Sequence, residues 1–469
     1  MTGWVPMPEP ALSLAPNELR RLGYRVVDRI VDHLDHLDEL APVPPVDPGW
    51  SPHRVAPCPD GPGDPVEAID ALFEEILPRG QRASHPRFFA RIGSPSNPVS
   101  PLADFAAAGV NAFAASWAGG SGPSAVELAV VDWMRAWMGL PEGAEGVLVS
   151  GGSVGNLTAL AAAAHGRVGA DRSRFTGYTS VHAHASIGRA WRVLGFDHKH
   201  LRVLEDDAAG RLTAAAVAEA IGDDRREGLD PLCVVATAGT TSTGAVDDLA
   251  GLAELCGREG AWMHVDGAYG APARLCDAGR EALHGIELAD SLVLDPHKWL
   301  FQPYEVGCVL VRHAGRLEEA FALDGAYLRD TVGAGVDLRN RSLQLSRGSR
   351  ALKLWLSLRV FGLNAFRDAI AHGLALAEHA ESTLRARAGW EVVSPAQLAI
   401  VCFRRAVDGA GADELDRIND ELVRAAVADG YAAPSSTVLD GRTAIRMCTI
   451  NPRTTFEEID RTIERLEAL

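Results

Sequence analysis

Basic side chains are in short supply in this sequence. It holds 45 lysine and arginine residues against 62 aspartate and glutamate residues, a formal net charge of −17 at pH 7. Proteins that bind nucleic acids or anionic membranes need a basic face, so the composition argues against both partners. The sequence also lacks any unbroken apolar run of about 18 residues, the length at which a helix crosses a bilayer.

Signals for export and for disulfide formation are missing as well. The first basic residue is Arg20, and prolines interrupt the stretch where a secretory signal has its apolar run. The seven cysteines are odd in number, scattered, and include no CxxC pair. This usage is typical of reduced thiols that fill core space. We therefore expect a cytoplasmic protein.

Metal-ligand spacing is scarce too. His33 and His36 share one face of a predicted helix, where they could hold a metal but more often belong to a solvated or interface surface. His182 and His184 stand two residues apart on a predicted strand, so they should point the same way. No third ligand with convincing spacing follows either pair. We expect no metal.

The sequence does contain enough apolar material for two or three domains. It has 469 residues, of which 47% are hydrophobic and 23% charged, as in ordinary globular chains. We divide it into an N-terminal helical arm (1–97), a large α/β domain (98–355) and a small α+β domain (356–469).

The arm combines an amphipathic helix with an extended connector. Residues 17–40 have apolar positions at helical spacing and begin with Asn17 as a plausible cap, while the proline-rich stretch 41–65 cannot be helical. Such an arm cannot bury its own apolar face, so we expect it to wrap around a partner subunit.

The middle of the chain alternates apolar runs with helical stretches. Because the apolar runs are continuous, they predict a mainly parallel sheet covered on both faces, with ligand chemistry at the carboxyl ends of its strands. The predicted strands are 146–149, 176–180, 201–204, 232–237, 261–265, 291–294 and 306–311, and the main helices are 155–167, 186–194, 213–222 and 247–259. The small domain should have long helices broken near Gly362, strands near 390–394, 399–404 and 443–450, and helices at 413–428 and 455–468.

A lysine follows one of these strands, in the segment Asp295-Pro296-His297-Lys298-Trp299. In a mostly buried setting the pKa of a lysine is lowered, and its amine becomes a usable nucleophile toward a carbonyl. The alternative is a lysine whose amine reaches the surface. The residues around it leave both open.

Asp266 ends another strand, in the segment 264–269. A buried carboxylate needs a partner, and a protonated pyridine nitrogen is one that a cofactor ring offers. The small residues Gly267 and Ala268 beside it would let a flat ring come close. The alternative is an aspartate that caps the following turn.

Two further loops complete the set. Residues 150–156 place glycines and the hydroxyl of Ser153 at a helix N-terminus, where backbone N–H groups and the helix dipole hold phosphates; the alternative is a helix start capped by Ser153. In residues 178–186, one of the two histidines could lay its ring flat on an aromatic cofactor. Together the four loops describe a pyridoxal-phosphate site.

Eight segments make this resemblance specific. GGSVGN, YTSVHAHAS, HVDGAYG and DPHKWLF occur in the order and spacing of the pyridoxal-phosphate-dependent group II amino-acid decarboxylases. HPRFFAR (85–91), SWAGGSGPSAVELAVVDWM (116–134) and the pair LSRGSRALKLWLSLRVFG (345–362) and TINPRTT (449–455) resemble segments of its aromatic branch. The likeness runs from about residue 70 to the end.

The family resemblance implies a fold, a reaction and an assembly. The fold would be the type I pyridoxal-phosphate fold, similar to aspartate aminotransferase, with a seven-stranded mainly parallel sheet. The enzyme would be a lyase that decarboxylates an L-amino acid, most often an aromatic one of the tryptophan or phenylalanine and tyrosine type, to an amine and CO2. It would act as a homodimer with each active site at the subunit interface.

The resemblance also implies roles for single residues. Lys298 would bind the aldehyde of the cofactor, His184 would stack on its ring, Asp266 would hold its ring nitrogen protonated, and Ala268 would pack against the other ring face. The phosphate end would be held by Gly152, Ser153, His297 and Asp295, with Thr241 near the ring or His184. The catalytic residues would be Lys298, His184 and Asp266.

This sequence departs from the family in its catalytic loop and its substrate pocket. The position of a loop tyrosine that helps to protonate Cα holds Leu338, which cannot donate a proton. Either His184 with a water or a group from another loop replaces it, or the reaction ends in an aldehyde instead of an amine. Substrate contacts would come from Ser94, Phe113, Ala115, Trp117 and His184, and the small Ala115 leaves room for a bulky ring such as indole.

Three rival interpretations explain less of the sequence. Gly151 to Gly155 fits the G-x-S-x-G elbow of serine hydrolases, with Asp266 and His297 in the matching order. A transaminase would need an arginine of the small domain, for which Arg446 is the only tempting candidate. A non-enzymatic dimeric binding protein would not need a buried lysine beside a pyridine site.

Overall fold

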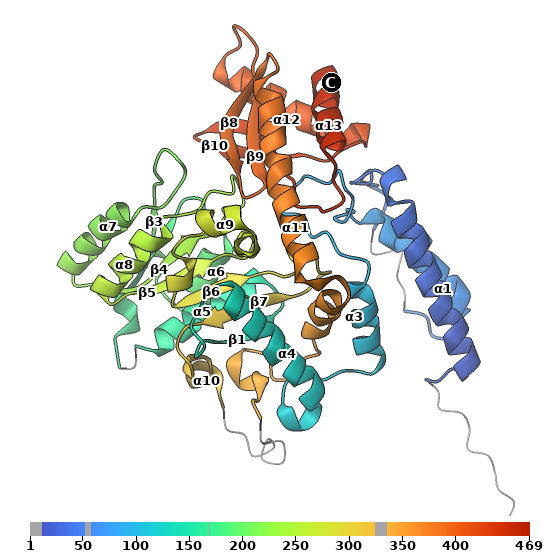
Figure 1. Cartoon of the computed structure of the whole chain (residues 1–469), viewed down its shortest axis with the longest axis horizontal. Helices are drawn as coiled ribbons and strands as arrows, with labels where there is room; N and C mark the ends of the chain where they lie inside the picture. The colour runs from blue at the N-terminus through green and yellow to red at the C-terminus, as the bar shows by residue number, and fades with distance from the viewer. Residues whose placement is uncertain (1–11, 52–57, 168, 324–334) are drawn as a thin grey trace, which may run out of the picture.

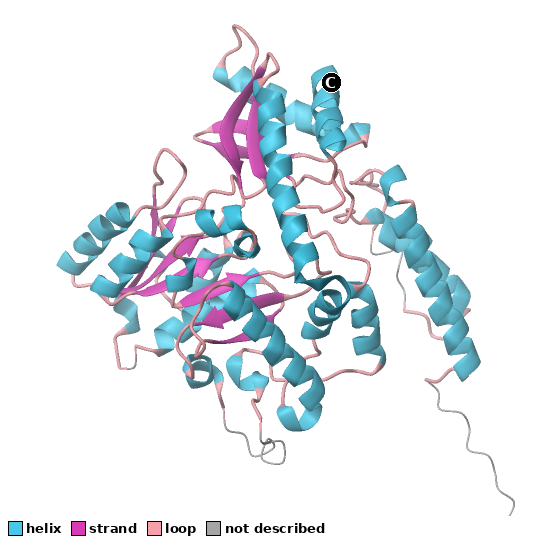
Figure 2. Cartoon of the chain, in the orientation of Figure 1, coloured by secondary structure: helices cyan, strands magenta, loops and turns pink. Residues whose placement is uncertain are grey.

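The computed structural model describes residues 12–51, 58–167, 169–323 and 335–469. Figure 1 shows a central α/β domain, a small sheet domain beside it, and an N-terminal arm that lies along one side of both. Figure 2 shows that helices surround the central sheet, as the continuous apolar strands predict. No helix of the described ranges is long and apolar enough to cross a membrane.

The central sheet confirms the predicted fold class. Its seven strands run in the order β1-β7-β6-β5-β4-β2-β3, and β7 is antiparallel to both of its neighbours while the other pairs are parallel. The strands are β1 (Glu145–Val149), β2 (Phe175–Ser180), β3 (Leu201–Leu204), β4 (Asp230–Thr237), β5 (Trp262–Asp266), β6 (Ser291–Leu294) and β7 (Gly307–Val311). All but β3 and the first residues of β4 and β5 are buried, which explains their unbroken apolar sequences.

Helix α8 of the large domain begins and ends where the sequence provides caps. The Asp248 side chain accepts a hydrogen bond from the Gly251 N–H at the start of α8, and Gly260 ends that helix in the left-handed conformation at φ 67°. The helices are α4 (Trp117–Trp137), α5 (Gly152–His165), α6 (Ser186–Val193), α7 (Ala214–Arg226), α8 (Leu249–Glu259), α9 (Asp277–Ala282) and α10 (Arg316–Phe321).

The small domain packs helices on a four-stranded antiparallel sheet with the order β10-β11-β9-β8. Its long helix breaks at Gly362, whose φ of 74° is outside the helical region, as predicted. The elements are α11 (Ala351–Arg385), β8 (Trp390–Gln397), β9 (Ile400–Arg405), α12 (Ala412–Asp429), β10 (Ser435–Leu439), β11 (Arg442–Cys448) and α13 (Phe456–Ala468). Strand β10 was not predicted, because this edge strand is mostly polar and half exposed.

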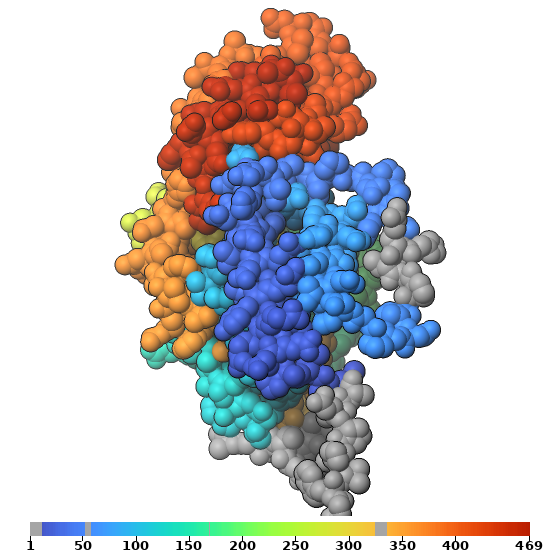
Figure 3. Space-filling model, turned by 90° about the vertical axis from the view of Figure 1, so that its right-hand side faces the viewer, coloured from blue at the N-terminus to red at the C-terminus, as the bar shows by residue number. Residues whose placement is uncertain are grey.

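The arm contains α1 (Pro16–Asp35) and α2 (Pro65–Ala71), and after an irregular stretch α3 (Ser100–Gly109) is the first helix of the predicted large domain. The prediction that Asn17 caps the first helix is wrong, since Pro16 is its first residue and Ala15 precedes it without a side-chain cap. Figure 3 shows the arm covering one face of the molecule. It leaves large apolar side chains of α1 exposed, namely Leu19, Tyr24 and Val31.

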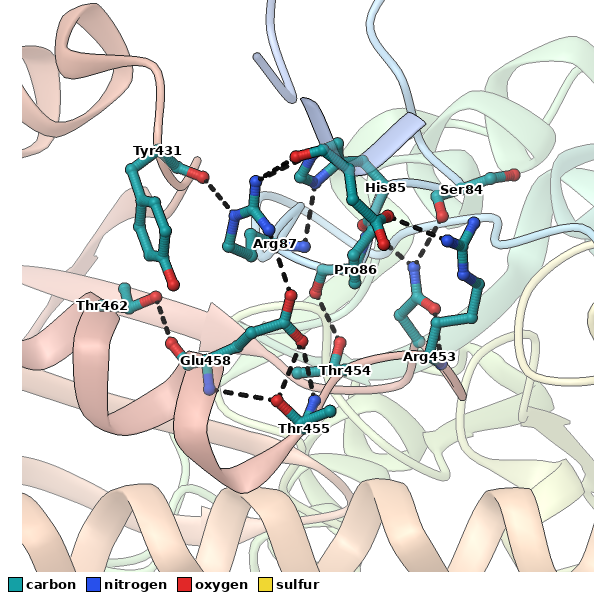
Figure 4. A network of polar contacts seen from close by, with 12 residues as sticks. Ser84, His85, Pro86, Arg87, Tyr431, Arg453, Thr454, Thr455, Glu458 and Thr462 are labelled. Carbon is teal, nitrogen blue, oxygen red and sulfur yellow. Dashed lines mark hydrogen bonds and ion pairs between the residues drawn. The ribbon is translucent and has the colours of Figure 1, made fainter. Parts of the chain in front are cut away.

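A polar cluster fastens the segment 84–87 to the small domain. Arg87 donates from Nε to the Tyr431 carbonyl (2.8 Å), from Nη1 to Glu458 Oε1 (3.1 Å) and from Nη2 to the Asp38 carbonyl (2.7 Å). Figure 4 shows these contacts meeting at Arg87. We call this group the clasp, and its members are Asp38, Ser84, His85, Pro86, Arg87, Tyr431, Asn451, Arg453, Thr454, Thr455 and Glu458.

Candidate active site

One cavity of about 250 Å³ lies at the carboxyl ends of five strands of the central sheet. It forms there because β1, β2, β4, β5 and β6 all stop at the same edge of the sheet, where the loops diverge. Every residue predicted to bind the cofactor lines it: Gly152, Ser153, His184, Thr241, Asp266, Ala268, Asp295, His297 and Lys298. The four loops that are far apart in sequence therefore meet.

Lys298 lies in this cavity beside a carboxylate. Its Nζ is 3.0 Å from Oδ2 of Asp295, whose side chain is only 2% exposed. Burial lowers the pKa of Lys298, but the charges of Asp295 and Asp266 and the hydrogen bond to Asp295 raise the pKa by more, so it stands above its ordinary value. The sequence-based expectation of a lowered pKa is wrong. The amine is held as an ammonium in this state and must lose a proton before it attacks a carbonyl.

Asp295 and His297 flank the lysine differently from each other. Asp295 contacts the Lys298 ammonium, and an ionised carboxylate has no proton to donate to a phosphate. The backbone N–H of Val306 donates to Nδ1 of His297 (3.2 Å), and burial lowers the pKa of this imidazole. The neutral ring then carries its proton on Nε2. Of the two, only His297 offers a hydrogen-bond donor for an anion.

Asp266 closes the end of β5 with both carboxylate oxygens in use. Oδ2 accepts from Nδ2 of Asn156 (2.8 Å), and Oδ1 accepts from the Ala268 N–H (3.1 Å). The second contact is the turn cap of the alternative interpretation, so the residue caps the turn and also lines the cavity. Oδ1 keeps acceptor capacity for a protonated ring nitrogen.

The start of α5 is shaped for an anion. The helix begins at Gly152, and Gly151 precedes it without any side-chain cap, so the alternative, a helix start capped by Ser153, is not what the structure has. A Cβ on Gly152 would lie 2.9 Å from Cβ of Ala268 and 3.1 Å from Oδ2 of Asp295, which leaves space only for a glycine. The first N–H groups of a helix have no intrahelical acceptor and attract anions. These residues fit the phosphate of pyridoxal phosphate.

The two histidines of the second loop lie in different surroundings in the structure. The expectation that both sit on a strand is wrong, because β2 ends at Ser180. His184 lines the cavity and its Nδ1 lies 2.8 Å from Oγ of Ser186. His182 instead lies 3.6 Å from a carboxylate oxygen of Asp206. Within the described ranges no three His, Cys, Asp or Glu side chains gather as a metal site.

Of the residues predicted to contact substrate, His184 lines this cavity, whereas Ser94, Phe113, Ala115 and Trp117 do not. Ser94 is 5% exposed and lies at a second cavity of about 700 Å³ beside the arm. Ala115 is fully buried and its carbonyl accepts from the Arg339 N–H, while the Trp117 N–H donates to Asp337. Phe113 pairs with Gly348. Within one chain, these side chains lie outside the cavity that Lys298 lines.

Leu338 is fully buried in an apolar cluster with Val147, Val149 and Val309. It opens a short 3₁₀ turn, Leu338–Arg341, and packs under the sheet rather than lining the cavity. Part of the loop before it, residues 324–334, lies outside the described residues. At this position the chain has a packing side chain in place of a proton donor.

Two rival interpretations lose their geometric basis. Arg446 is 2% exposed and donates to the carbonyls of Ser242 and Arg91 outside the cavity, so it is not placed as the carboxylate-binding arginine of a transaminase. Among the hydrogen bonds of the described residues, none joins Ser153 to His297 or His297 to Asp266. A serine-hydrolase triad is not assembled.

Sequence reasoning missed several residues around the cavity. Asn156 and Ser186 line it and bond to Asp266 and His184, and Tyr269 lines it with its ring stacked on Trp299 at 5.2 Å. Asn156 stands inside the GGSVGN segment, but nothing in the sequence says which residue its amide meets. Its partners come from other strands and helices.

Comparisons with known proteins agree with this arrangement. The family model of the pyridoxal-dependent decarboxylase conserved domain matches residues 57–406. The chain is 42% identical to an aromatic-L-amino-acid decarboxylase of Bacillus atrophaeus, over 98% of this chain and 96% of the relative. It is 29% identical to phenylacetaldehyde synthase of Arabidopsis thaliana, over 94% and 93% of the two chains. A crystal structure of Oryza sativa TDC with PLP and tryptamine matches with a TM-score of 0.92 at 27% identity, covering 98% of this chain and 99% of that one.

Proposed function

Because the chain belongs to the pyridoxal-dependent decarboxylase family, we propose that it removes the carboxylate of aromatic L-amino acids as CO2 and releases the amine. Its cofactor is pyridoxal phosphate and its reaction is that of an amino-acid carboxy-lyase. The single observation that carries the substrate class is the 42% identity, across nearly the whole chain, to an aromatic-L-amino-acid decarboxylase.

The cavity has a residue for each part of the cofactor. We assign Lys298 to its aldehyde carbon and Asp266 to its ring nitrogen, and His184 and Ala268 to the two faces of the ring. Gly152, Ser153 and His297 are assigned to its phosphate, with Thr241 beside the ring. When bound, pyridoxal phosphate supplies an electron sink for the bond that breaks at Cα.

The side chains of the protein hold charges and protons around the bound cofactor. Asp266 keeps a negative charge against the ring nitrogen and so keeps a proton there. Asp295 holds the Lys298 amine 3.0 Å away and can accept the proton that this amine loses. His184 offers a second ring nitrogen toward the cavity, where it can hold a proton near Cα. These roles require positioned groups, because orientation supplies much of the rate.

Two candidate reactions differ in their product, an amine or an aldehyde. The aldehyde route, which consumes oxygen and releases peroxide, is favoured by Leu338, since a buried leucine replaces a proton-donating side chain. A relative named phenylacetaldehyde synthase supports the same alternative. We propose the amine as the product, because His184 remains in the cavity as a proton-holding group.

We further propose a homodimer with the active site at the subunit interface and the arm reaching onto the partner. The predicted substrate residues Ser94, Phe113, Ala115 and Trp117 lie outside the cavity of their own chain, so the partner could supply equivalent side chains. The exposed apolar side chains of α1 offer a surface for it. Seven unpaired cysteines support placement in the reducing cytoplasm. Light scattering that finds a stable and active monomer would contradict the dimer.

One experiment tests the reaction. Purified protein with pyridoxal phosphate is incubated with tryptophan, phenylalanine, tyrosine and glutamate, and CO2, amine, aldehyde and peroxide are measured together. Amine and CO2 from an aromatic substrate without peroxide are expected. Aldehyde with peroxide would establish the alternative, and turnover of glutamate alone would overturn the aromatic assignment. Borohydride should fix the mass of the cofactor on Lys298.

A further inference from the structure

A chain of hydrogen bonds runs behind the cavity along one face of β5. Alternate strand residues share a face, so Trp262, His264 and Asp266 all point toward α5. Nε1 of Trp262 donates to Oγ of Ser291 (2.7 Å), and the same Oγ lies 2.8 Å from Nδ1 of His264. Nε2 of His264 lies 2.9 Å from Oδ1 of Asn156.

The chain continues from Asn156 to the residues that face the cofactor. Nδ2 of Asn156 donates to Oδ2 of Asp266 (2.8 Å) and to Oγ of Ser186 (2.9 Å). The Ser186 hydroxyl lies 2.8 Å from Nδ1 of His184. We call these seven residues the relay: Trp262, Ser291, His264, Asn156, Asp266, Ser186 and His184. Its inner members are buried, so water does not compete for these contacts.

Hydrogen-bond chemistry fixes the direction of the protons between Asp266 and His264. The carboxylate of Asp266 can only accept, so Asn156 presents Nδ2 to it and Oδ1 to His264. Oδ1 can only accept, so the proton of His264 must be on Nε2. At the other end, the indole of Trp262 can only donate, so Ser291 accepts from it and its own hydroxyl proton is free to point to Nδ1 of His264.

His184 is held in the same way. Oγ of Ser186 accepts from Asn156, so its hydroxyl proton points to Nδ1 of His184, and the Ser186 N–H donates to that atom as well at 3.2 Å. Nδ1 is therefore an acceptor, and the neutral ring carries its proton on Nε2. Because His184 lines the cavity, this N–H is the donor that the ring offers there.

We propose that Asn156 is a positioning residue that joins Asp266 to His184, and that the relay fixes His264 and His184 as Nε2-protonated tautomers before substrate binds. The consequence for catalysis rests on the proposed function, but the tautomers do not. Asn156 ties the carboxylate at the ring nitrogen to the imidazole at the ring face. A residue that served only for packing would set neither tautomer.

The test reads the tautomers directly. Full-length protein labelled with ¹⁵N-histidine is examined by long-range ¹H–¹⁵N NMR with and without pyridoxal phosphate, and variants at His184 and His264 assign their signals. Wild-type protein should show a protonated Nε2 and an unprotonated Nδ1 at both residues near pH 7. A protonated Nδ1, or a mixture at His264, would overturn the proposal, even if no variant folds.

Variants that remove the contacts at one end of the relay, or at both ends, measure the contributions of Asn156 and Trp262 separately. In Trp262→Phe the Asp266 end still fixes His264, so this variant should keep one tautomer, whereas Asn156→Leu removes the acceptor at Nε2 and should show both tautomers of His264. The double variant should show both tautomers of His264. A double variant that keeps the single tautomer contradicts the proposal.

Cofactor affinity provides the second readout. Asn156→Leu should weaken binding of pyridoxal phosphate about tenfold, the scale of lost supporting contacts around a functional site, because Asp266 loses its amide partner. Trp390→Phe is the matched control, since its half-buried indole donates to Glu467 in the small domain, and its affinity should equal that of wild type. Unchanged affinity in Asn156→Leu would contradict the positioning role. Loss of borohydride labelling at Lys298 in wild type would instead refute the proposed function and leave the tautomers standing.

Discussion

The relay is a buried polar network and the clasp a partly exposed one, and the two differ in how many of their hydrogen-bonding groups are already paired within the protein. In the clasp, Arg87 reaches three acceptors with its three nitrogens, and its ion pair with Glu458 is 13% and 17% exposed at the two side chains. In the relay, one ring nitrogen of His184 remains available to a ligand on the cavity side. Asp266 also has acceptor capacity left on that side. A network that joins two segments of the fold pairs its hydrogen-bonding groups within the protein. A network around a ligand site leaves some of these groups available to the ligand.

The two networks also differ in how they use charge. The clasp pairs a guanidinium with a carboxylate between distant segments, the turn at 84–87 and the start of α13. Behind the cavity, neutral amide, hydroxyl and imidazole groups lead to one carboxylate, and burial lowers the pKa of His264 to about 4, so it stays uncharged. Changes in the clasp should therefore reduce stability, while changes at the cavity should reduce activity.

The largest expected effect is at Lys298. In Lys298→Ala the amine that holds the cofactor aldehyde is gone, so kcat/KM for an aromatic substrate should fall by about 10³-fold or more, as when a central catalytic group is lost. Steady-state kinetics and borohydride labelling measure this. The melting temperature should fall as well, because the variant leaves the buried carboxylate of Asp295 without its ion-pair partner, so the loss of borohydride labelling is the readout specific to the lysine.

Asp266→Asn should follow in size. The amide has the same shape but no negative charge to keep the ring nitrogen protonated, so kcat should fall about 10²- to 10³-fold, the range for losing one preorganised electrostatic partner. The visible absorption band of the bound cofactor should persist. Full activity in this variant would remove Asp266 from the catalytic set.

Arg87→Met should destabilise the fold by about 3 kcal/mol, because it leaves Glu458 and two carbonyls without their donor in a mostly buried site. Chemical denaturation measures the loss. Arg417→Met is the control, since Arg417 forms an exposed pair with Glu421 on α12 worth about 0.5 kcal/mol or less. If Arg87→Met lost cofactor affinity without losing stability, the division between the two networks would fail.

The smallest effect is a pH dependence from His85 in the clasp. Burial lowers the pKa of His85 to about 4, and it is fully buried. The unfolded chain, with a histidine pKa of about 6.5, then binds more protons than the folded one as pH falls. Stability is complete above pH 6.5 and should fall by about 2 kcal/mol between pH 6.5 and pH 5 on account of this residue. His85→Asn should flatten this part of the pH profile of unfolding, and an unchanged profile would show that His85 does not contribute.

Sequence reasoning worked best where one local signal was sufficient. Six of the seven strands of the large sheet were recognisable because they are buried along nearly all of their length and carry apolar runs, while β3 is half exposed. The polar edge strand β10 gave no such signal, and it forms because β11 lies next to it. Lys298, Asp266 and His184 were each placed in the cavity, since loops that follow parallel strands converge at one edge.

Reasoning from the sequence failed where two residues from different loops meet. The pKa of Lys298 was expected to fall with burial, but Asp266 and Asp295 lie close enough to raise it. Asn156 was visible in its segment, but its role depends on His264, Asp266 and Ser186, which reach it from β5 and α6. Leu338 was noted as a missing proton donor, and only its packing against Val147 and Val149 shows what it does.

The sequence by itself determined the fold class, the cofactor chemistry and the identities of the residues at the strand ends, because periodicity and side-chain type are local properties. The tertiary structure decided which charges face one another, which histidine enters the cavity and how its protons are directed. Those properties depend on distances of a few ångströms between segments that are separate in the sequence, such as those of Asn156 and Asp266, and such distances exist only once the chain has folded.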